Sequence, residues 1–339
     1  MNSSRHASTS ASPALHVHPL RDGALLRRCD AAPIGPPVRR LTLLQRGRLH
    51  SSLPLLYINM IAKTAISALL ASAAMAMPAT PTTPEAGFSV GALDSRQLNG
   101  KVTNSAIANF NADNTNDGIG AGKDEYHMYY GNGGTAAGWP DRNRWVSFVD
   151  MFNNYKNQMF SSCGGQGQAN DSGPEVGAIY DGIQKAAKAS GVDHRFILAV
   201  IMQESGGCVR VKTTNYGVRN PGLMQDHDGQ ATCNENGNVQ NPCPSGTIYQ
   251  MISEGTAGTS KGEGLAQTLN RQGHSDVSAF YRAARLYNSG SISKTGNLQD
   301  GIATHCYSAD IANRLTGWVN APSQCKCDDN PSSCGITTN

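Results

Sequence analysis

A single glutamate at the end of an apolar run is the first feature of this sequence that suggests chemistry. Residues 196–202 are all apolar, Asp193 precedes them as a helix cap, and Glu204 follows with a Ser-Gly-Gly sequence directly after it. The run is too short to span a membrane, so it predicts a helix buried on most sides. Burial and the negative end of the helix dipole both raise the pKa of a carboxyl group at that position. Such a group can donate a proton at neutral pH.

The alternative for Glu204 alone is a solvated surface residue, because most glutamates are exposed. Two further motifs favour the chemical interpretation. Residues 204–207 (ESGG), 222–225 (GLMQ) and 287–290 (YNSG) occur in this order. Together they resemble the three signatures of the lytic transglycosylase and goose-type lysozyme superfamily, which are Glu-Ser, Gly-Leu-Met-Gln and Tyr-Asn-Ala/Ser-Gly. The resemblance covers residues 174–320 and says nothing about the rest of the chain.

This resemblance implies a lysozyme-like fold, α+β and mainly α-helical, with Glu204 as the catalytic proton donor. It also implies that a Tyr-Asn pair approaches the acid and the sugar, and that the segment 222–225 closes the cleft. The residues matched to substrate binding are Ser205, Met224, Gln225, Tyr287 and Asn288. For Tyr287 and Met224 the alternative is plain core packing.

A second carboxylate would decide the mechanism. An inverting hydrolase needs a base about 6.5–9.5 Å from the acid. Goose-type lysozymes carry such an Asp between the first two motifs, but the 17 residues between Glu204 and Gly222 contain no acid. Asp226 and Asp228 follow the second motif, and nothing in the sequence places them in the cleft. A single glutamate fits a lytic transglycosylase, in which the acid later acts as base toward a hydroxyl of the same sugar.

The predicted function is therefore cleavage of β-1,4 bonds in N-acetylhexosamine polymers, with peptidoglycan as the foremost substrate. Three alternatives stay open: a lysozyme-type hydrolase, a chitin-active enzyme, and a non-catalytic carbohydrate-binding protein on the same fold. No cofactor or metal is expected. The predicted partner is the polysaccharide, without nucleic acid or, after signal removal, a membrane, and the protein is expected to be a monomer.

The front of the chain has the composition of a targeting region. Residues 1–59 hold eight Arg and two acids, whereas the residues after 76 carry a net charge of −4, which argues against nucleic-acid binding. Residues 60–76 read as a secretory signal ending in an A-x-A site. The preferred explanation is a mispredicted upstream start with Met60 as the true one, and the alternative for residues 1–59 is a transit peptide. Secretion is the expected localisation.

Eight cysteines follow the signal, an even number that fits disulfides in an oxidising compartment. Eight cysteines allow 105 pairings. Among these, Cys233–Cys243 is the preferred single pair because it would close a Gly/Asn/Pro loop. Cys325, Cys327 and Cys334 lack the paired spacing of a zinc site and have no nearby His, so disulfides are expected there too.

The remaining organisation follows composition and periodicity. Residues 77–144 begin Pro/Thr-rich and become Asn/Gly-rich, which predicts an irregular N-terminal region. Residues 145–320 form the predicted lysozyme-like domain, and 321–339 a Cys-containing tail. Within the domain, apolar spacing predicts helices over residues 145–160, 174–190, 264–272, 277–288 and 308–318, besides a short one starting at Thr247.

Overall fold

The computed structural model describes residues 100–109 and 111–337. All of them belong to one compact unit, Thr80–Asn339. The predicted leader (1–59), the signal sequence (60–76) and the start of the N-terminal region lie outside the described residues. Within the described part of the chain, no helix combines the length and the apolar character that crossing a membrane requires.

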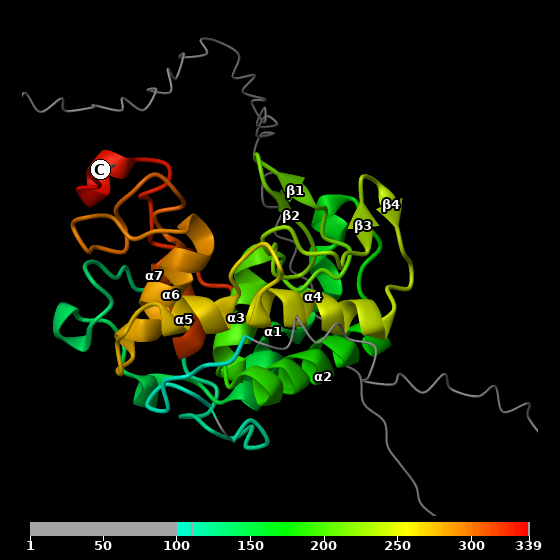
Figure 1. Ribbon diagram of the computed structural model, residues 1–339, viewed down its shortest axis with the longest axis horizontal. Helices are drawn as coiled ribbons and strands as arrows, with labels where there is room; N and C mark the ends of the chain where they lie inside the picture. The colour runs from blue at the N-terminus through cyan, green and yellow to red at the C-terminus, as the bar shows by residue number, and fades with distance from the viewer. Residues whose placement is uncertain (1–99, 110, 338–339) are drawn as a thin grey trace, which may run out of the picture. The chain divides into compact units, whose positions relative to one another are not determined.

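The described residues form a mainly helical structure (Figure 1). The seven α-helices are α1 (Phe148–Ser162), α2 (Gly173–Ser190), α3 (His194–Glu204), α4 (Ser245–Ala257), α5 (Leu265–Asn270), α6 (Ser278–Ser289) and α7 (Tyr307–Thr316). Short 3-10 helices lie at Thr135–Ala137, Arg142–Arg144, Gly164–Gln166 and Pro331–Cys334.

Two small antiparallel hairpins accompany the helices. Strands β1 (Thr214–Asn215) and β2 (Arg219–Asn220) pair in the segment after α3, with Thr214 opposite Asn220. Strands β3 (Asn234–Glu235) and β4 (Asn238–Val239) form the second hairpin before α4. The expected α+β class with mainly α-helical content is therefore confirmed.

Helix α3 lies at the centre of the packing. Every side chain from Phe196 to Ile201 has 0% exposure, and α3 contacts α1, α2, α4 and α7. An apolar helix that is surrounded on all sides removes nearly all of its apolar surface from water. This burial contributes roughly 25 cal/mol per Å² to the free energy of folding and is the main source of fold stability. The predicted buried helix is thus confirmed, and its end is held firmly in place.

The helix ends follow the capping residues read from the sequence. Asp193 accepts a hydrogen bond from the backbone N–H of Arg195 at the start of α3. Ser172 and Glu175 form a capping box at the start of α2, and Gly191 ends that helix with φ 74°. Boundaries elsewhere differ by a few residues from the periodicity, and α1 begins at Phe148 because Ser147 provides the cap.

The irregular segment before α1 contributes to the same core. Val102, Ile107 and Trp139 are buried, and Trp145 has 0% exposure. The backbone N–H of Val102 donates to the carbonyl of Ser190 at 2.8 Å, joining this segment to the end of α2. The predicted domain boundary at residue 145 stays a prediction.

Four disulfides connect the eight cysteines that follow the predicted signal. They are Cys163–Cys208, Cys233–Cys243, Cys306–Cys325 and Cys327–Cys334. The preferred pairing of Cys233 with Cys243 is confirmed, and so is the preference for disulfides over zinc among the last three cysteines. Four disulfides fit folding in an oxidising compartment.

Candidate functional site

Glu204 is the last residue of α3, and its side chain is half-buried. Burial raises the pKa of this carboxyl group to about 7, while a hydrogen bond from the Tyr307 hydroxyl acts in the opposite direction and lowers it. Near neutral pH the group is therefore present in both protonated and ionised forms. A group in that state can give and then take back a proton within one reaction.

Tyr307 is a site residue that the sequence motifs did not indicate. It begins α7, is 3% exposed, and donates to Glu204 Oε1 at 2.5 Å. Burial and the neighbouring Glu204 charge raise the pKa of Tyr307 well above its usual value, so this phenol remains a donor. The only sequence signal was an apolar-periodic helix near residue 308, which resembles any packing helix.

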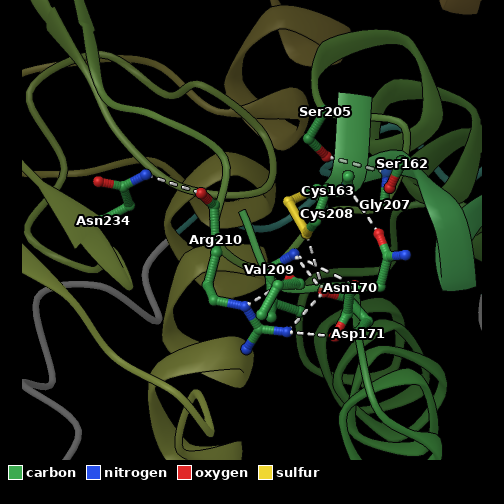
Figure 2. The surroundings of a disulfide bond; sticks show 12 residues. Ser162, Cys163, Asn170, Asp171, Ser205, Gly207, Cys208, Val209, Arg210 and Asn234 are labelled. Atoms are coloured by element: carbon green, nitrogen blue, oxygen red, sulfur yellow. Dashed lines mark hydrogen bonds and ion pairs between the residues drawn. A yellow bond between two sulfur atoms is a disulfide. The ribbon is translucent and has the colours of Figure 1, made fainter. Parts of the chain in front are cut away.

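The turn after Glu204 is fixed by its own hydrogen bonds and by a disulfide (Figure 2). Gly206 and Gly207 have φ values of 62° and 81°, which glycine adopts most readily. The Ser205 hydroxyl donates to the carbonyl of Ile201 at 2.9 Å and accepts from Gly207 N–H at 3.2 Å. These two hydrogen bonds make the Ser205 hydroxyl a cap on the end of α3, and the residue is 5% exposed.

Close after Cys208, one of the two cysteines of this disulfide, a cluster of buried charged side chains fixes the segment around Arg210 (Figure 2). Arg210 is 0% exposed and forms ion pairs with Asp171 and Glu175. Burial favours the neutral acid at Glu175, but hydrogen bonds from Arg210 and from backbone N–H groups outweigh it and lower its pKa to about 2. Removing one partner of a buried ion pair leaves the other charge buried without compensation, which is strongly destabilising. This cluster therefore anchors the segment that leads away from Glu204.

The segment 222–225 lies over α4 and carries one outward residue. Met224 is 0% exposed, and its sulfur accepts a hydrogen bond from the Thr256 hydroxyl at 3.8 Å. Its side chain therefore packs inside the protein. Gln225 is half-buried with φ 45°, and its amide donates to the Gly222 carbonyl at 3.0 Å.

Gln225, Tyr287 and Asn288 come together in one cavity of about 460 Å³. This is within the usual size range of ligand pockets. We name it the cleft; its other lining residues include Asn220, His227, Lys261, Glu263, Ser289 and Gly290. Most of these side chains can form hydrogen bonds, as recognition of a sugar requires.

Tyr287 connects the cleft to the acid. Its hydroxyl donates to the carbonyl of Met224 at 2.9 Å, which ties α6 to the segment 222–225. Burial, followed by the charges of Asp226 and Glu204, raises the pKa of Tyr287 well above its usual value. Glu204 itself is not among the residues that line the cleft, and its link to the cleft is the effect of its charge on Tyr287.

Asp226 and Asp228 were the candidates for a second carboxylate, and they differ sharply. Asp226 is 3% exposed, and burial together with the charge of Glu254 raises its pKa well above its usual value. A Cβ at Gly229 would lie 2.1 Å from Asp226 Oδ1 and 2.7 Å from Glu254 Oε2, which shows how close the two acids are. Asp228 lies 3.5 Å from Lys261 Nζ near the surface.

Three side-chain groups in the described part of the chain have the composition of a metal site. Two of them consist largely of disulfide-bonded cysteines, which cannot coordinate as thiolates. The third is Asp117, Asp193 and His194. Asp193 pairs with Arg142 and Arg195 at 2.6 and 2.7 Å, so cations of the protein already occupy this cluster.

Comparison of the chain with family models, with curated proteins and with solved structures found no match. The roles of the six motif residues therefore rest on the motifs and on the geometry described above.

Proposed function

We propose that this protein is a secreted glycosidase-type enzyme with a lysozyme-like fold, acting on β-1,4-linked N-acetylhexosamine polymers, foremost peptidoglycan. The observation that carries the proposal is the state of Glu204. A half-buried carboxyl group with a pKa of about 7, held by a buried phenol, is a proton donor at the pH of most extracellular fluids. A protein that only bound sugars would have no use for one.

In the proposed reaction Glu204 protonates the oxygen of the glycosidic bond while positive charge develops on the sugar carbon. The Tyr307 hydroxyl then stabilises the ionised carboxylate, because a charge-assisted hydrogen bond is stronger than a neutral one. Gln225 and Asn288 orient the sugar in the cleft, and Tyr287, which lines the cleft and lies within the influence of the Glu204 charge, connects the bound sugar with the acid.

The second half of the reaction follows from the acids near the site. Asp226 is buried, and burial together with the Glu254 charge raises its pKa well above its usual value, so its ionised form is disfavoured and it is poorly suited to activate water. Asp228 is engaged with Lys261. The ionised Glu204 is therefore the base: it takes a proton from a hydroxyl of the same sugar, and that oxygen bonds to the sugar carbon whose glycosidic bond has broken. This lytic transglycosylase route gives an anhydro product without water.

Export and partners belong to the same proposal. The four disulfides support folding in an oxidising compartment, and the polysaccharide is the proposed partner of a monomer that needs no cofactor.

The test is the chemistry of the product. Purified protein is incubated with peptidoglycan, and the soluble fragments are analysed by mass spectrometry, with Glu204→Gln as the inactive control. Anhydro-muropeptides without new reducing ends are expected. Reducing fragments, heavier by one water, would mean hydrolysis and contradict the single-acid route. Cleavage of chitin oligomers but not peptidoglycan would replace the substrate, and binding without cleavage of either would make the protein a carbohydrate-binding one.

A further inference from the structure

A second cavity of about 330 Å³ lies beside the cleft, at the turn that ends α6. Ser289 lines both cavities, so the two share a wall. The motif 287–290 thus separates two hollows rather than bordering one. The residues of the second cavity that matter here are Arg285, Ser289, Lys294, Asp300 and Gly301.

Arg285 is a buried cation in this wall. It is 1% exposed, and no acid of the described residues lies within ion-pair distance of it. Its Nη1 donates to the Thr304 carbonyl at 2.6 Å and its Nη2 to the Asp300 carbonyl at 2.8 Å. Its Nε has no hydrogen-bond partner among the described residues. Leaving a donor of a buried charged group unpaired is costly, so this arrangement is incomplete without a further acceptor.

Two acids act on the charge of Arg285 from beyond ion-pair distance. Burial lowers the pKa of Arg285, and the charges of Asp328 and Asp300 offset this only in part. Both carboxylate oxygens of Asp300 are already occupied: Oδ2 accepts from Thr295 and Asn297, and Oδ1 accepts from the Thr337 N–H.

Two further features of the wall favour an anion. Lys294 adds an exposed second positive charge on the same cavity. Gly301 has φ 105°, and a Cβ there would lie 3.1 Å from Arg285 Nη2. The absence of a side chain at Gly301 therefore leaves room beside Nη2, one of the guanidinium nitrogens that can pair with a carboxylate in a fork.

Arg285 is also linked to the cleft through Asn288. Nη1 of Arg285 lies 3.5 Å from Asn288 Oδ1, and Asn288 lines the cleft. The guanidinium therefore lies between the proposed sugar-binding amide and the second cavity. Ser289, which lines both cavities, lies at the wall between a sugar held by Asn288 and the second cavity.

We propose that the second cavity is an anion subsite, in which Arg285 and Lys294 take the carboxylate of an acidic sugar held in the cleft. This inference rests on the proposed function and makes it more specific. The preferred polymer carries a carboxylate beside the hexosamine ring, and an uncharged polymer such as chitin would leave the subsite empty.

The test compares the binding of N-acetylmuramic acid and N-acetylglucosamine to the Glu204→Gln protein, with inorganic phosphate as a probe of the anion site alone. Titration by calorimetry or NMR gives the affinities at low and at high salt. The variant Lys294→Glu reverses an exposed charge without disturbing packing, and Lys101→Glu is the matched change outside both cavities. Arg285→Lys keeps the charge but loses the fork, and a melting curve shows whether that variant is folded.

The expected result is about tenfold tighter binding of the acidic sugar, the size of one charge-assisted hydrogen bond. Lys294→Glu should remove this preference, high salt should weaken it, and Lys101→Glu should leave it unchanged. Equal affinity for both sugars, or an acidic preference that survives Lys294→Glu, would overturn the subsite while leaving the proposed function intact. Phosphate binding that depends on Lys294, with neither sugar bound, would support the anion site and count against the glycan function.

Discussion

The hydroxyl of Tyr307 lies 2.5 Å from Oε1 of Glu204 and joins the first residue of α7 to the last residue of α3. The two side chains influence each other in opposite directions. The phenol stabilises the ionised carboxylate and so lowers the pKa of Glu204, whereas the carboxylate raises the pKa of the phenol. The pKa of about 7 at Glu204 is therefore a balance between burial, which raises it, and Tyr307.

Removing that hydroxyl should shift the pH dependence of activity toward alkaline pH. In Tyr307→Phe only burial acts on Glu204, so its pKa rises above 7 and the protonated donor persists to higher pH. The alkaline limb of kcat/KM should move upward, while kcat falls because the ionised intermediate state is less stabilised. Tyr180→Phe removes a half-buried phenol elsewhere and should leave the profile unchanged. A limb that moves to lower pH would contradict the assignment of Tyr307.

Glu204→Gln should separate activity from stability. Loss of a general acid lowers the rate by about 10²–10⁴-fold, so less than a hundredth of the activity should remain. Stability should change in the opposite sense. The folded pKa of about 7 lies above the ordinary value of 4.5, so ionisation costs stability progressively from about pH 4.5 and in full above pH 7.

The amide of Glu204→Gln does not ionise, so the variant should gain on the order of 3 kcal/mol over wild type above pH 7 and show no gain below pH 4. Urea unfolding at several pH values measures this difference. Glu125→Gln, at an exposed acid, is the matched control. An equal effect of Glu204→Gln at all pH values would mean that Glu204 is an ordinary solvated carboxylate.

Some of this site follows from the sequence and some does not. The buried helix before Glu204, its Asp193 cap and its end at Ser-Gly-Gly were readable because capping and apolar runs are local features. Tyr307 was not, because its meeting with Glu204 depends on how α7 packs against α3, across 103 residues of sequence. For the same reason the sequence did not indicate that Asp226, in a loop, lies close to Glu254 of α4.

Asp226→Asn should leave activity close to wild type. Burial and the Glu254 charge raise the pKa of Asp226 well above its usual value, and asparagine keeps the shape of the neutral acid without an ionisable proton. Because the folded pKa is raised, ionisation of Asp226 costs stability as pH rises, and the variant should be relatively more stable at alkaline pH. Activity assays and urea unfolding at pH 6 and pH 9 check both points, with Asp228→Asn as the control. Loss of most activity in Asp226→Asn would instead make Asp226 the base of a hydrolase.

The disulfide Cys163–Cys208 should matter more to stability than Cys327–Cys334. It joins the end of α1 to the turn after Glu204 across 45 residues, whereas the other spans 7. A cross-link restricts the unfolded chain more when its loop is longer, which gives about 4 kcal/mol for the first and about 2 kcal/mol for the second. Paired Cys→Ser variants and urea unfolding measure both. Replacing Cys163 and Cys208 by serine should also lower activity near the unfolding midpoint. The reason is that the Ser205–Gly207 turn, which follows Glu204, leads directly into Cys208. A larger loss of stability on removing Cys327–Cys334 would contradict the loop-length argument, and unchanged activity without Cys163–Cys208 would mean that this bond does not hold the acid in place.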